Sequence, residues 1–554
     1  MNDRPHPSPH LPNGRFWLKS YLPGTPSEID PSQLPTLKEL CESACARYAD
    51  SPALTQGEKT LSFAELEVLS RSFGAWLQSV GARKGDRVAL MLPNILEFPV
   101  ALFGALRVGM TVVCLNPMYT SSEIQHPLND ARPVVLVTLD VLRSMFEACG
   151  SCASLRYIIT VGGGEVSTSE LLTGDQCRCL PWTQAVRASL EISLKSERVE
   201  PNDLAFIQYT GGTTGSPKGV MLTHRNLCAN ILQSVVLIRP YADRQRTLVT
   251  LLPLYHIFAL EGSLFLFTHL GWRNVLVADA RNLPVAVAEL ARYPIAFLSG
   301  VNTLLRGLLH APGFSALDFS HLKITLSGGM ATEPQVAKRW YEVTGCHITQ
   351  AWGLTEASPG ASCNFPGVPF NGSVGLPLPS TEIAIKDEAG EDLPLGEVGE
   401  ICVRGPQVMR GYWQRPKDTS QAFWPGAWLR TGDAGRFDDQ GFVYLTERLK
   451  DVIVVSGFKV YPLEVEAAAV TFPGVLEAAA TAQRDGGSSE SVALFVVCAG
   501  ESIDEATLIR HCRQTLAPYK VPKRVYVRAA LPKSSIGKIL RKALREELTK
   551  PLVE

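Results

Sequence analysis

Hydrophobic residues alternate between two patterns along the chain, and these predict helices separated by short buried strands. The clearest helix begins at Ser62-Phe63-Ala64-Glu65, which is typical of a capping box, and its apolar positions recur at helical spacing as far as Gly81. Continuous apolar runs predict strands covered on both faces, as in largely parallel sheets. These runs lie at 87–92, 110–115, 134–138, 157–161, 204–209, 247–252, 275–277 and 324–326.

The pattern changes between about residues 372 and 441, where short strand-like segments such as 382–386 and 400–404 are separated by glycine-containing turns. This change predicts a small antiparallel sheet or barrel. A charged run, Glu447–Asp451, then precedes a last unit of about 100 residues. We therefore expect an α/β protein with an N-terminal domain at 1–447 and a C-terminal domain at 448–554.

The most apolar stretch, Phe98–Leu115, contains Arg107 and two glycines, so it predicts a buried helix followed by a strand instead of a membrane span. The chain has 554 residues with 53 Lys+Arg and 54 Asp+Glu, and its net charge of −1 gives no reason to expect nucleic acid as a partner. The N-terminal residues lack the hydrophobic segment of a secretory signal. We expect a cytoplasmic protein.

A short aromatic segment, Phe16–Leu22, has two interpretations. It could lie on a membrane surface, which would suit peripheral contact with the inner face of the membrane, or it could pack against the body of the protein. Packing is the favoured interpretation.

Thirteen cysteines in a chain without a secretory signal predict reduced thiols. The pairs Cys149 and Cys152, and Cys177 and Cys179, have spacings that loosely fit a zinc site, but no histidine lies nearby in the sequence. Buried or incidental thiols are the favoured interpretation.

Candidate chemistry begins at the glycine-rich and threonine-rich segment Tyr209–Gly219, directly after the predicted strand at 204–209. Glycines let the backbone approach an anion with its N–H groups, and hydroxyls with an ammonium complete a phosphate site. Pro217 before Lys218 distinguishes the segment from a Walker A loop. A flexible surface loop is the alternative. The expected phosphate-binding residues are Thr210, Gly211, Gly212, Thr213, Thr214, Gly215 and Lys218.

Four further clusters combine chemistry-bearing residues. The segment Gln350–Glu356 contains an aromatic ring, a hydroxyl and a carboxylate, which suit a purine, a phosphate and Mg²⁺, although a helix cap explains Thr355-Glu356 equally well. Asp433 suits ribose hydroxyls, with a turn aspartate as the alternative. The other two clusters are 448–462 and Pro532–Ile539, which presents Lys538 before a basic helix.

The C-terminal segment from Glu505 onward carries twelve Lys/Arg against four Glu, a net charge of +8. This excess predicts either a solvated basic face or a lid that approaches anionic phosphates.

The order and spacing of these clusters resemble the adenylate-forming superfamily, which includes acyl-CoA synthetases, beetle luciferase and the adenylation domains of peptide synthetases. The resemblance extends from about residue 35 to 548 and is nearest to bacterial long-chain fatty acid–CoA ligases. It implies a large N-terminal domain of two mostly parallel sheets flanked by helices, with a small β-barrel at about 372–441, followed by a small mobile α+β C-terminal domain. The stretches that point to these ligases are the Thr-Gly-Gly form of the loop, 299–304, 405–413 and 455–462.

The resemblance implies two half-reactions. A carboxylate attacks the α-phosphate of ATP to give an acyl-adenylate and pyrophosphate, and coenzyme A then displaces AMP to form a thioester. Lys538 would bridge the carboxylate and the α-phosphate, with Thr355 on the same phosphate, while Glu356 and Thr210 would hold Mg²⁺. Lys218 and its loop would bind the leaving pyrophosphate. The remaining nucleotide-binding residues implied are Gly328, Gly329, Gln350, Ala351, Trp352 and Gly353 for adenine, and Asp433 and Arg448 for ribose.

The resemblance also implies that the C-terminal domain rotates about a hinge at Lys450 and brings Ser456, Gly457 and Phe458 to the coenzyme A site. His256 occupies a position that would line the acyl and thiol channels, with a core histidine satisfied by the backbone as the alternative. The acyl pocket is expected between the His256 segment, 300–304 and 328–330.

Several alternatives stay open. The chain could be an acyl-AMP ligase that loads a carrier protein, a coenzyme A ligase for medium-chain or aryl acids, or a silent binding homologue. No insertion precedes residue 450, which disfavours the first, and Lys218, Glu356, Asp433 and Lys538 are all present, which disfavours the last. We expect fatty acid, ATP and coenzyme A as ligands. The oligomeric state, for which a homodimer is one option, is left open.

Overall fold

The structure is a computed structural model, and it describes residues 15–145, 152–162, 177–187, 192–210, 217–242, 246–448, 451–455, 458–484, 490–499, 503–534 and 537–549. The chain divides into two compact units. The larger unit comprises Tyr21–Glu382 and Val403–Leu429, and the smaller unit comprises Met1–Ser20, Ile383–Cys402 and Arg430–Glu554. The boundary between domains that we expect at 447/448 stays a prediction.

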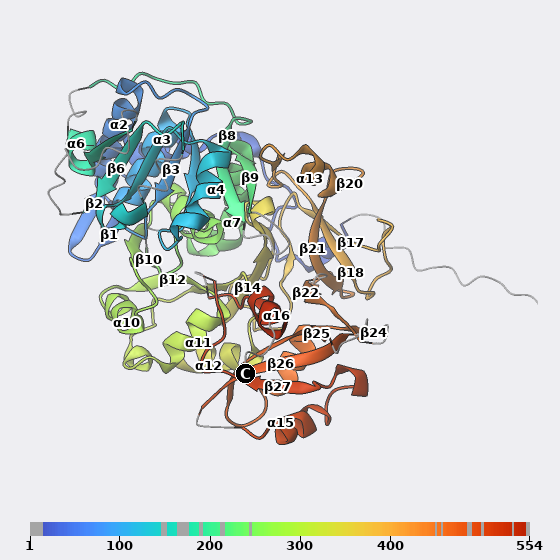
Figure 1. The fold of residues 1–554 in the computed structure, drawn as a ribbon. Helices are drawn as coiled ribbons and strands as arrows, with labels where there is room; N and C mark the ends of the chain where they lie inside the picture. Colours follow the sequence, from blue (N-terminus) through green and yellow to red (C-terminus); the bar gives the residue numbers. More distant parts are fainter. Residues whose placement is uncertain are drawn as a thin grey trace, which may run out of the picture. The chain divides into compact units, whose positions relative to one another are not determined.

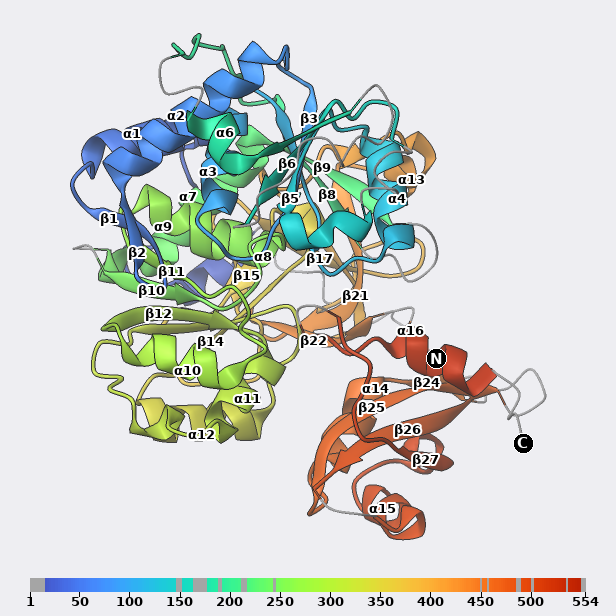
Figure 2. The ribbon, with the colours of Figure 1, turned by 60° about the vertical axis from the view of Figure 1, so that its left-hand side comes forward.

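Two sheets dominate the larger unit (Figures 1 and 2). The nine-stranded sheet is parallel from β14 to β1 and antiparallel at both edges. Its strands, in spatial order, are β16 (Leu376–Pro377), β15 (Gly360–Cys363), β14 (Ile348–Gly353), β13 (Ile324–Ser327), β12 (Ile295–Gly300), β10 (Thr247–Thr250), β11 (Arg273–Leu276), β1 (Pro52–Gln56) and β2 (Lys59–Ser62).

The eight-stranded sheet is parallel from β8 to β7, whereas β9 and β19 are antiparallel to their neighbours. In spatial order its strands are β19 (Gly411–Tyr412), β9 (Lys218–Thr223), β8 (Leu204–Thr210), β4 (Thr111–Cys114), β3 (Arg87–Met91), β5 (Val135–Leu139), β6 (Tyr157–Val161) and β7 (Arg178–Pro181). These positions confirm the strands predicted from the apolar runs, with ends that differ by one or two residues.

Helices cover both faces of each sheet, as the unbroken apolar strands predict. In β3, Val88 and Leu90 pack in the same hydrophobic core as residues of α2 and α3. Ala89 and Met91 lie on the opposite face and pack with residues of α4. Figure 2 shows α10, α11 and α12 together on one face of the nine-stranded sheet. The helices of this unit are η2 (Pro31–Gln33), α1 (Leu37–Arg47), α2 (Phe63–Ser79), α3 (Glu97–Arg107), α4 (Ser121–Ala131), η3 (Asp140–Met145), α6 (Trp182–Arg187), α7 (His224–Ile238), η4 (Arg239–Tyr241), α8 (Ile257–Ala259), η5 (Leu260–Phe265), α9 (Leu266–His269), α10 (Leu283–Ala291), α11 (Asn302–His310), η6 (Phe314–Ala316), α12 (Pro334–Thr344), η7 (Thr355–Ala357) and α13 (Pro416–Gln421).

The predicted capping box at the start of α2 is confirmed. The Ser62 hydroxyl accepts from the Glu65 N–H, and the Glu65 carboxylate accepts from the Ser62 N–H. The helix ends at Ser79, and Gly81 follows with a φ of +79°.

A buried arginine explains why the apolar stretch at 98–115 is interrupted by a charge. Arg107, the last residue of α3, is 1% exposed. Its guanidinium donates to Glu42 Oε1 at 3.2 Å and to Ser70 Oγ at 3.1 Å, and it also pairs with Glu67. The stretch is a core helix followed by strand β4, as predicted, and no helix among the described residues is long and apolar enough to cross a membrane.

Replacing Glu42 and Glu67 together by glutamine should lower the free energy of unfolding of the larger unit by about 2–4 kcal/mol. The guanidinium would stay buried without a counter-charge, and the loss falls below the ~3–5 kcal/mol of a fully buried pair because the Glu42 side chain is 39% exposed. Urea titration measures the change. Glu342→Gln, which breaks a surface pair with Arg339, is the control and should cost less than about 0.5 kcal/mol. Equal losses in both variants would contradict the expectation.

The smaller unit contains most strands of a five-stranded sheet in the order β17-β18-β21-β20, with β22 paired to β21. This agrees with the small antiparallel sheet predicted at 372–441. The N-terminal η1 (Phe16–Ser20) packs on it: Trp17 is 4% exposed and stacks on Phe437 at 5.9 Å, and Lys19 donates to the Asp439 carbonyl. The prediction that the aromatic segment at 16–22 packs against the protein is therefore confirmed for η1. The strands are β17 (Glu382–Lys386), β18 (Gly399–Arg404), β20 (Phe423–Trp424), β21 (Trp428–Phe437) and β22 (Val443–Arg448).

The C-terminal part of this unit is an α+β sandwich (Figure 1). One face of the sheet, including Ala478 and Ala480, packs on α14 and α15, and the other face, including Ala479, packs on α16. The elements are β23 (Ile453–Val455), β24 (Phe458–Val460), α14 (Pro462–Ala469), β25 (Val475–Arg484), β26 (Glu490–Cys498), α15 (Glu505–Cys512), η9 (Pro518–Lys520), β27 (Arg524–Val527) and α16 (Arg541–Thr549). The predicted α/β fold with an α+β C-terminal part is confirmed.

Candidate active site

The predicted phosphate loop connects two strands whose ends are firmly held. Thr210 at the end of β8 lies directly opposite Lys218 at the start of β9. Helix α4 braces both sides: His126 Nε2 lies 2.8 Å from the Pro217 carbonyl oxygen, and the Tyr209 hydroxyl donates to Asp130 at 2.6 Å. The loop residues Gly211, Gly212, Thr213, Thr214 and Gly215 lie outside the described residues.

Lys218 is surrounded by groups from a distant part of the sequence. Its Nζ lies 2.5 Å from Asp418 Oδ1 and 5.0 Å from the centre of the Tyr412 ring. The Tyr412 hydroxyl donates to Glu356 Oε1 at 2.9 Å, and burial, with the Glu356 carboxylate next, raises the pKa of Tyr412. Two predicted site residues, Lys218 and Glu356, are thus linked through one tyrosine.

The segment Gln350–Glu356 is a strand followed by a single helical turn, so the helix-cap interpretation is wrong: the residue before η7 is Leu354, which makes no side-chain cap. Trp352 is 5% exposed. At Gly353 a Cβ would lie 2.0 Å from the Pro359 carbonyl oxygen, so only glycine fits this approach of β14 to the next strand. The side chain of Gln350, in the middle of β14, donates to the Ser373 carbonyl.

The predicted adenine-binding glycines lie beside the His256 segment. A Cβ at Gly328 would lie 3.3 Å from both the Ala351 carbonyl oxygen and the Phe258 ring. Gly329 follows with a φ of +77°. His256 is half-buried and accepts at Nδ1 from the Phe258 N–H at 3.3 Å, as the backbone-satisfied alternative requires. The structure brings these positions together: Gly328 directly follows β13, Ala351 lies in the neighbouring β14, and His256 immediately precedes α8.

A buried carboxyl group follows this segment. Glu261 lies in η5, a π-helical turn, and is 4% exposed. Its Oε1 accepts from the Ser234 hydroxyl of α7 at 3.2 Å, and burial raises its pKa to about 8. Glu261 is therefore mostly protonated at neutral pH.

Asp433 and Arg448 belong to the smaller unit and lie directly opposite each other on β21 and β22. Asp433 is 7% exposed, and its N–H donates to the Thr431 hydroxyl at 3.1 Å. The turn interpretation of Asp433 is wrong, since the residue sits within a strand. The predicted ribose-binding pair is thus adjacent in the fold.

The backbone of Lys538 is held by described residues on both sides. The Ser534 N–H donates to the Lys538 carbonyl at 2.7 Å, and Gly537 has a φ of +80°. On the flanks, Lys533 pairs with Glu477 at 2.7 Å and Arg541 pairs with Glu466 at 2.8 Å. The half-buried lysine is therefore presented from a fixed base.

The predicted hinge Lys450, together with Ser456 and Gly457 of the coenzyme A loop, lies outside the described residues. Phe458 opens β24, is 57% exposed and stacks on Tyr519 at 4.8 Å. An exposed aromatic ring at this position is compatible with ligand contact.

The basic C-terminal segment is less unbalanced than its own composition indicates. Among the described residues of the segment, six lysines and arginines form ion pairs within the smaller unit, and four of their acidic partners come from earlier in the chain. The pairs are Lys520–Glu464, Arg528–Glu547, Lys533–Glu477, Arg541–Glu466, Lys542–Glu546 and Arg545–Asp451.

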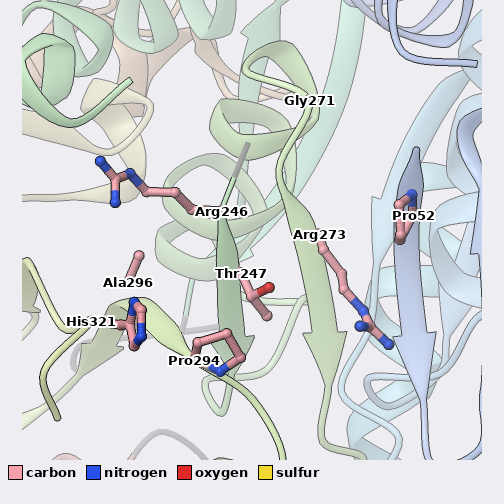
Figure 3. Close-up of a pocket in the computed structure, with 8 residues that line it drawn as sticks. All are labelled: Pro52, Arg246, Thr247, Gly271, Arg273, Pro294, Ala296 and His321. Atoms are coloured by element: carbon pink, nitrogen blue, oxygen red, sulfur yellow. The ribbon is translucent and has the colours of Figure 1, made fainter. Parts of the chain in front are cut away.

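A cavity of about 370 Å³ lies elsewhere in the larger unit, at the amino ends of the parallel strands (Figure 3). Arg246, Arg273 and His321 line it, but Figure 3 shows the two arginine side chains pointing apart. Ligands of parallel sheets bind at the carboxyl ends of the strands, where Gly300, Gly328 and Gly353 lie. The cavity is therefore distinct from the candidate active site.

The burial of the described cysteines agrees with the interpretation of buried thiols. Twelve cysteines lie in the described part of the chain; eleven are buried and Cys498 is half-buried. The same part contains no group of three His, Cys, Asp or Glu side chains that could hold a metal ion. Cys149 lies outside the described residues.

The two-sheet fold is that of adenylate-forming CoA ligases. Residues 41–413 match the AMP-binding enzyme family, and residues 464–538 match the AMP-binding enzyme C-terminal domain. The chain belongs to the AMP-binding enzyme family, and the resemblance inferred from its motifs is confirmed.

Relatives cover nearly the whole chain. The long-chain-fatty-acid–CoA ligase of Escherichia coli O6:H1 is 43% identical, covering 96% of this chain and 98% of the relative, and that of Bacillus subtilis is 35% identical with the same coverage. Among solved structures, the anthranilate CoA ligase AuaEII in complex with anthranoyl-AMP has a TM-score of 0.84 at 25% identity, covering 94% of this chain and 99% of that one. ATP-bound MatB from Rhodopseudomonas palustris has a TM-score of 0.81 at 28% identity, covering 92% and 98%.

Sequence reasoning missed several residues of the loop surroundings. Tyr412 lies in the stretch 405–413, but the sequence predicts no role for it, and Asp418, His126 and Asp130 belong to none of the predicted clusters. No local pattern marks them, because they reach the loop through tertiary packing of α4, β19 and α13. The Gly411-Tyr412-Trp413 sequence was the one available signal.

Proposed function

We propose that this chain activates a long-chain fatty acid with ATP and transfers the acyl group to coenzyme A, releasing AMP and pyrophosphate. The observation that carries the proposal is the 43% identity, over 96% of the chain, to a long-chain-fatty-acid–CoA ligase. The link between Lys218, Tyr412 and Glu356 beside the loop supports it, because it joins a phosphate-binding cation to a candidate metal-binding carboxylate.

In the first half-reaction the substrate carboxylate attacks the α-phosphate, and negative charge grows on the phosphoryl oxygens. Lys538 and Thr355 stabilise that charge, while Lys218 and the loop bind the leaving pyrophosphate. Trp352 and its neighbouring glycines frame adenine. Asp433 accepts from the ribose hydroxyls, and Arg448 lies opposite Asp433 on the neighbouring strand.

The residues present fit Mg²⁺. Glu356 is half-buried and its Oε1 accepts from Tyr412, which orients the carboxylate and leaves Oε2 as a hard oxygen donor. Thr210, at the strand end across from Lys218, supplies a hydroxyl. Glu356 and Thr210 would hold the ion, which neutralises phosphate charge when bound. Mg²⁺ usually takes few protein ligands and several from phosphates and water, so a larger cluster is unnecessary.

In the second half-reaction the smaller C-terminal part turns about Lys450. Lys538 withdraws, and Ser456, Gly457 and Phe458 approach the adenylate, which lets the coenzyme A thiolate attack the acyl carbon and release AMP. His256 lines the channel to the acyl group. The protein is cytoplasmic in this proposal and meets its apolar substrate at the inner face of the membrane.

The proposal is tested by ATP–pyrophosphate exchange with acids of increasing length, with and without coenzyme A. We expect exchange with laurate, palmitate and oleate in the absence of coenzyme A, and formation of acyl-CoA when it is added. Exchange that is absent with every acid would leave only a binding homologue.

A coenzyme A ligase for aryl acids is the second candidate. A 4-coumarate–CoA ligase of Pinus taeda is 32% identical over 94% of this chain, so the aryl relatives share the same scaffold. Adding 4-coumarate and benzoate to the exchange series distinguishes the two candidate functions. The fatty acid proposal requires a much higher kcat/KM for palmitate than for either aryl acid. Exchange without transfer to coenzyme A would instead indicate a ligase that loads a carrier protein.

A further inference from the structure

The carboxylate that contacts Lys218 is unusual for a phosphate site. Asp418 Oδ1 lies 2.5 Å from Lys218 Nζ, and neither side chain is more than 37% exposed. A site that binds polyanions gains from cations and loses from a fixed negative charge at the same position. The presence of the Asp418 carboxylate beside Lys218 therefore calls for a functional explanation.

The position of Asp418 is set by the backbone, not by a mobile side chain alone. Strand β19 pairs with β9, so Tyr412 lies opposite Val220 and the Trp413 N–H donates to the Gly219 carbonyl at 2.7 Å. Helix α13, which carries Asp418, is tied to this strand because the Tyr412 N–H donates to the Thr419 hydroxyl at 2.9 Å.

Gly411 permits this close packing. Its φ is +143°, and a Cβ there would lie 2.6 Å from the Thr419 side chain. Strand β19, which pairs with the strand that begins at Lys218, and helix α13, which carries Asp418, are thus packed closely together. This packing holds the Asp418 carboxylate beside the Lys218 ammonium group.

The ammonium group has a second neighbour that keeps it in place. The Tyr412 ring lies 5.0 Å away, and its hydroxyl is bonded to Glu356. Lys218 can therefore exchange Asp418 for a phosphate oxygen without leaving the ring. A bound phosphate and the Asp418 carboxylate then share one cation and repel each other.

We propose that Asp418 is an internal counter-ion that competes with pyrophosphate for Lys218 and speeds release of this product. The inference rests on the proposed function, in which Lys218 binds the leaving pyrophosphate. It adds a residue that weakens product binding, and so limits reversal of adenylate formation.

The test compares wild type with Asp418→Asn, which keeps the shape of the side chain and removes its charge. We expect about fivefold to tenfold tighter binding of Mg²⁺-pyrophosphate by calorimetry, and an equally lower inhibition constant for pyrophosphate against ATP. The difference should shrink as NaCl is raised, because the pair is partly exposed. Asp318→Asn makes the same charge change on an exposed loop and should leave both constants unchanged.

Unchanged or weaker pyrophosphate binding in Asp418→Asn would overturn the inference, the latter showing that Asp418 merely positions Lys218. Wild type that binds no pyrophosphate would overturn it too. The calorimetry needs no acyl substrate, so a chain that fails the fatty acid exchange assay can still confirm or refute the role of Asp418.

Discussion

Replacing Lys538 by alanine is expected to slow adenylate formation by about 10²–10³-fold or more, because the variant loses the cation that faces charge developing on the α-phosphate. Thioester formation from supplied acyl-AMP and coenzyme A should change by less than about threefold, since Lys538 has withdrawn by that step. Pyrophosphate exchange measures the first half-reaction, and acyl-CoA production from acyl-AMP measures the second.

The structure offers a matched control for this variant. Lys542 is the second residue of α16, four residues after Lys538; it is exposed and pairs with Glu546 at 3.7 Å, so Lys542→Ala should leave both half-reactions intact. Equal loss of both half-reactions in Lys538→Ala would refute the assigned role. The anchoring pairs of Lys533 and Arg541 stay in place in either variant.

Glu261→Gln is expected to remove a large pH dependence from stability. The pKa of Glu261 is raised from 4.5 to about 8 by burial, so the folded state holds a proton that the unfolded chain has released. Stability is fullest below pH 4.5 and falls as pH rises toward 8, at ~1.4 kcal/mol per pH unit. Relative to wild type, the variant should therefore gain about 3–4 kcal/mol between pH 5 and pH 8.

Thermal and urea unfolding of both proteins across this pH range measure the gain. Glutamine keeps the acceptor for the Ser234 hydroxyl, so packing of η5 on α7 is preserved. Glu342→Gln serves as the surface control and should follow the wild-type curve. Parallel curves for Glu261→Gln and wild type would show that Glu261 does not titrate in this range.

Local patterns predicted the elements well because each is specified by nearby residues. The capping box at Ser62, the helix–strand succession at 98–115 and strand β8 before the loop all follow from short-range spacing. The aromatic segment at Trp17 was also correctly expected to pack, since a large ring gains most from burial.

Tertiary partners could not be predicted in the same way. Asp418 lies 200 residues after Lys218 in the sequence, and no local pattern predicts that Glu466 pairs with Arg541. The positive charge of the C-terminal segment is partly balanced for the same reason, because four of the acidic partners lie before residue 505. One of the two interpretations places Asp433 in a turn. In the structure it lies in β21, and the register with β22 places Arg448 opposite it.

Because its described cysteines are mostly buried, the enzyme can be assayed with a thiol-reactive dye that detects the coenzyme A thiol. Burial raises the pKa of Cys177 to about 11 and those of Cys363 and Cys402 to about 12, so little thiolate forms at assay pH. A disulfide dye such as Ellman's reagent should therefore read consumption of coenzyme A with little background from the described cysteines. After urea is added, the same dye becomes a clock for unfolding, as Cys177 and Cys363 report on the larger unit and Cys512 on the smaller one.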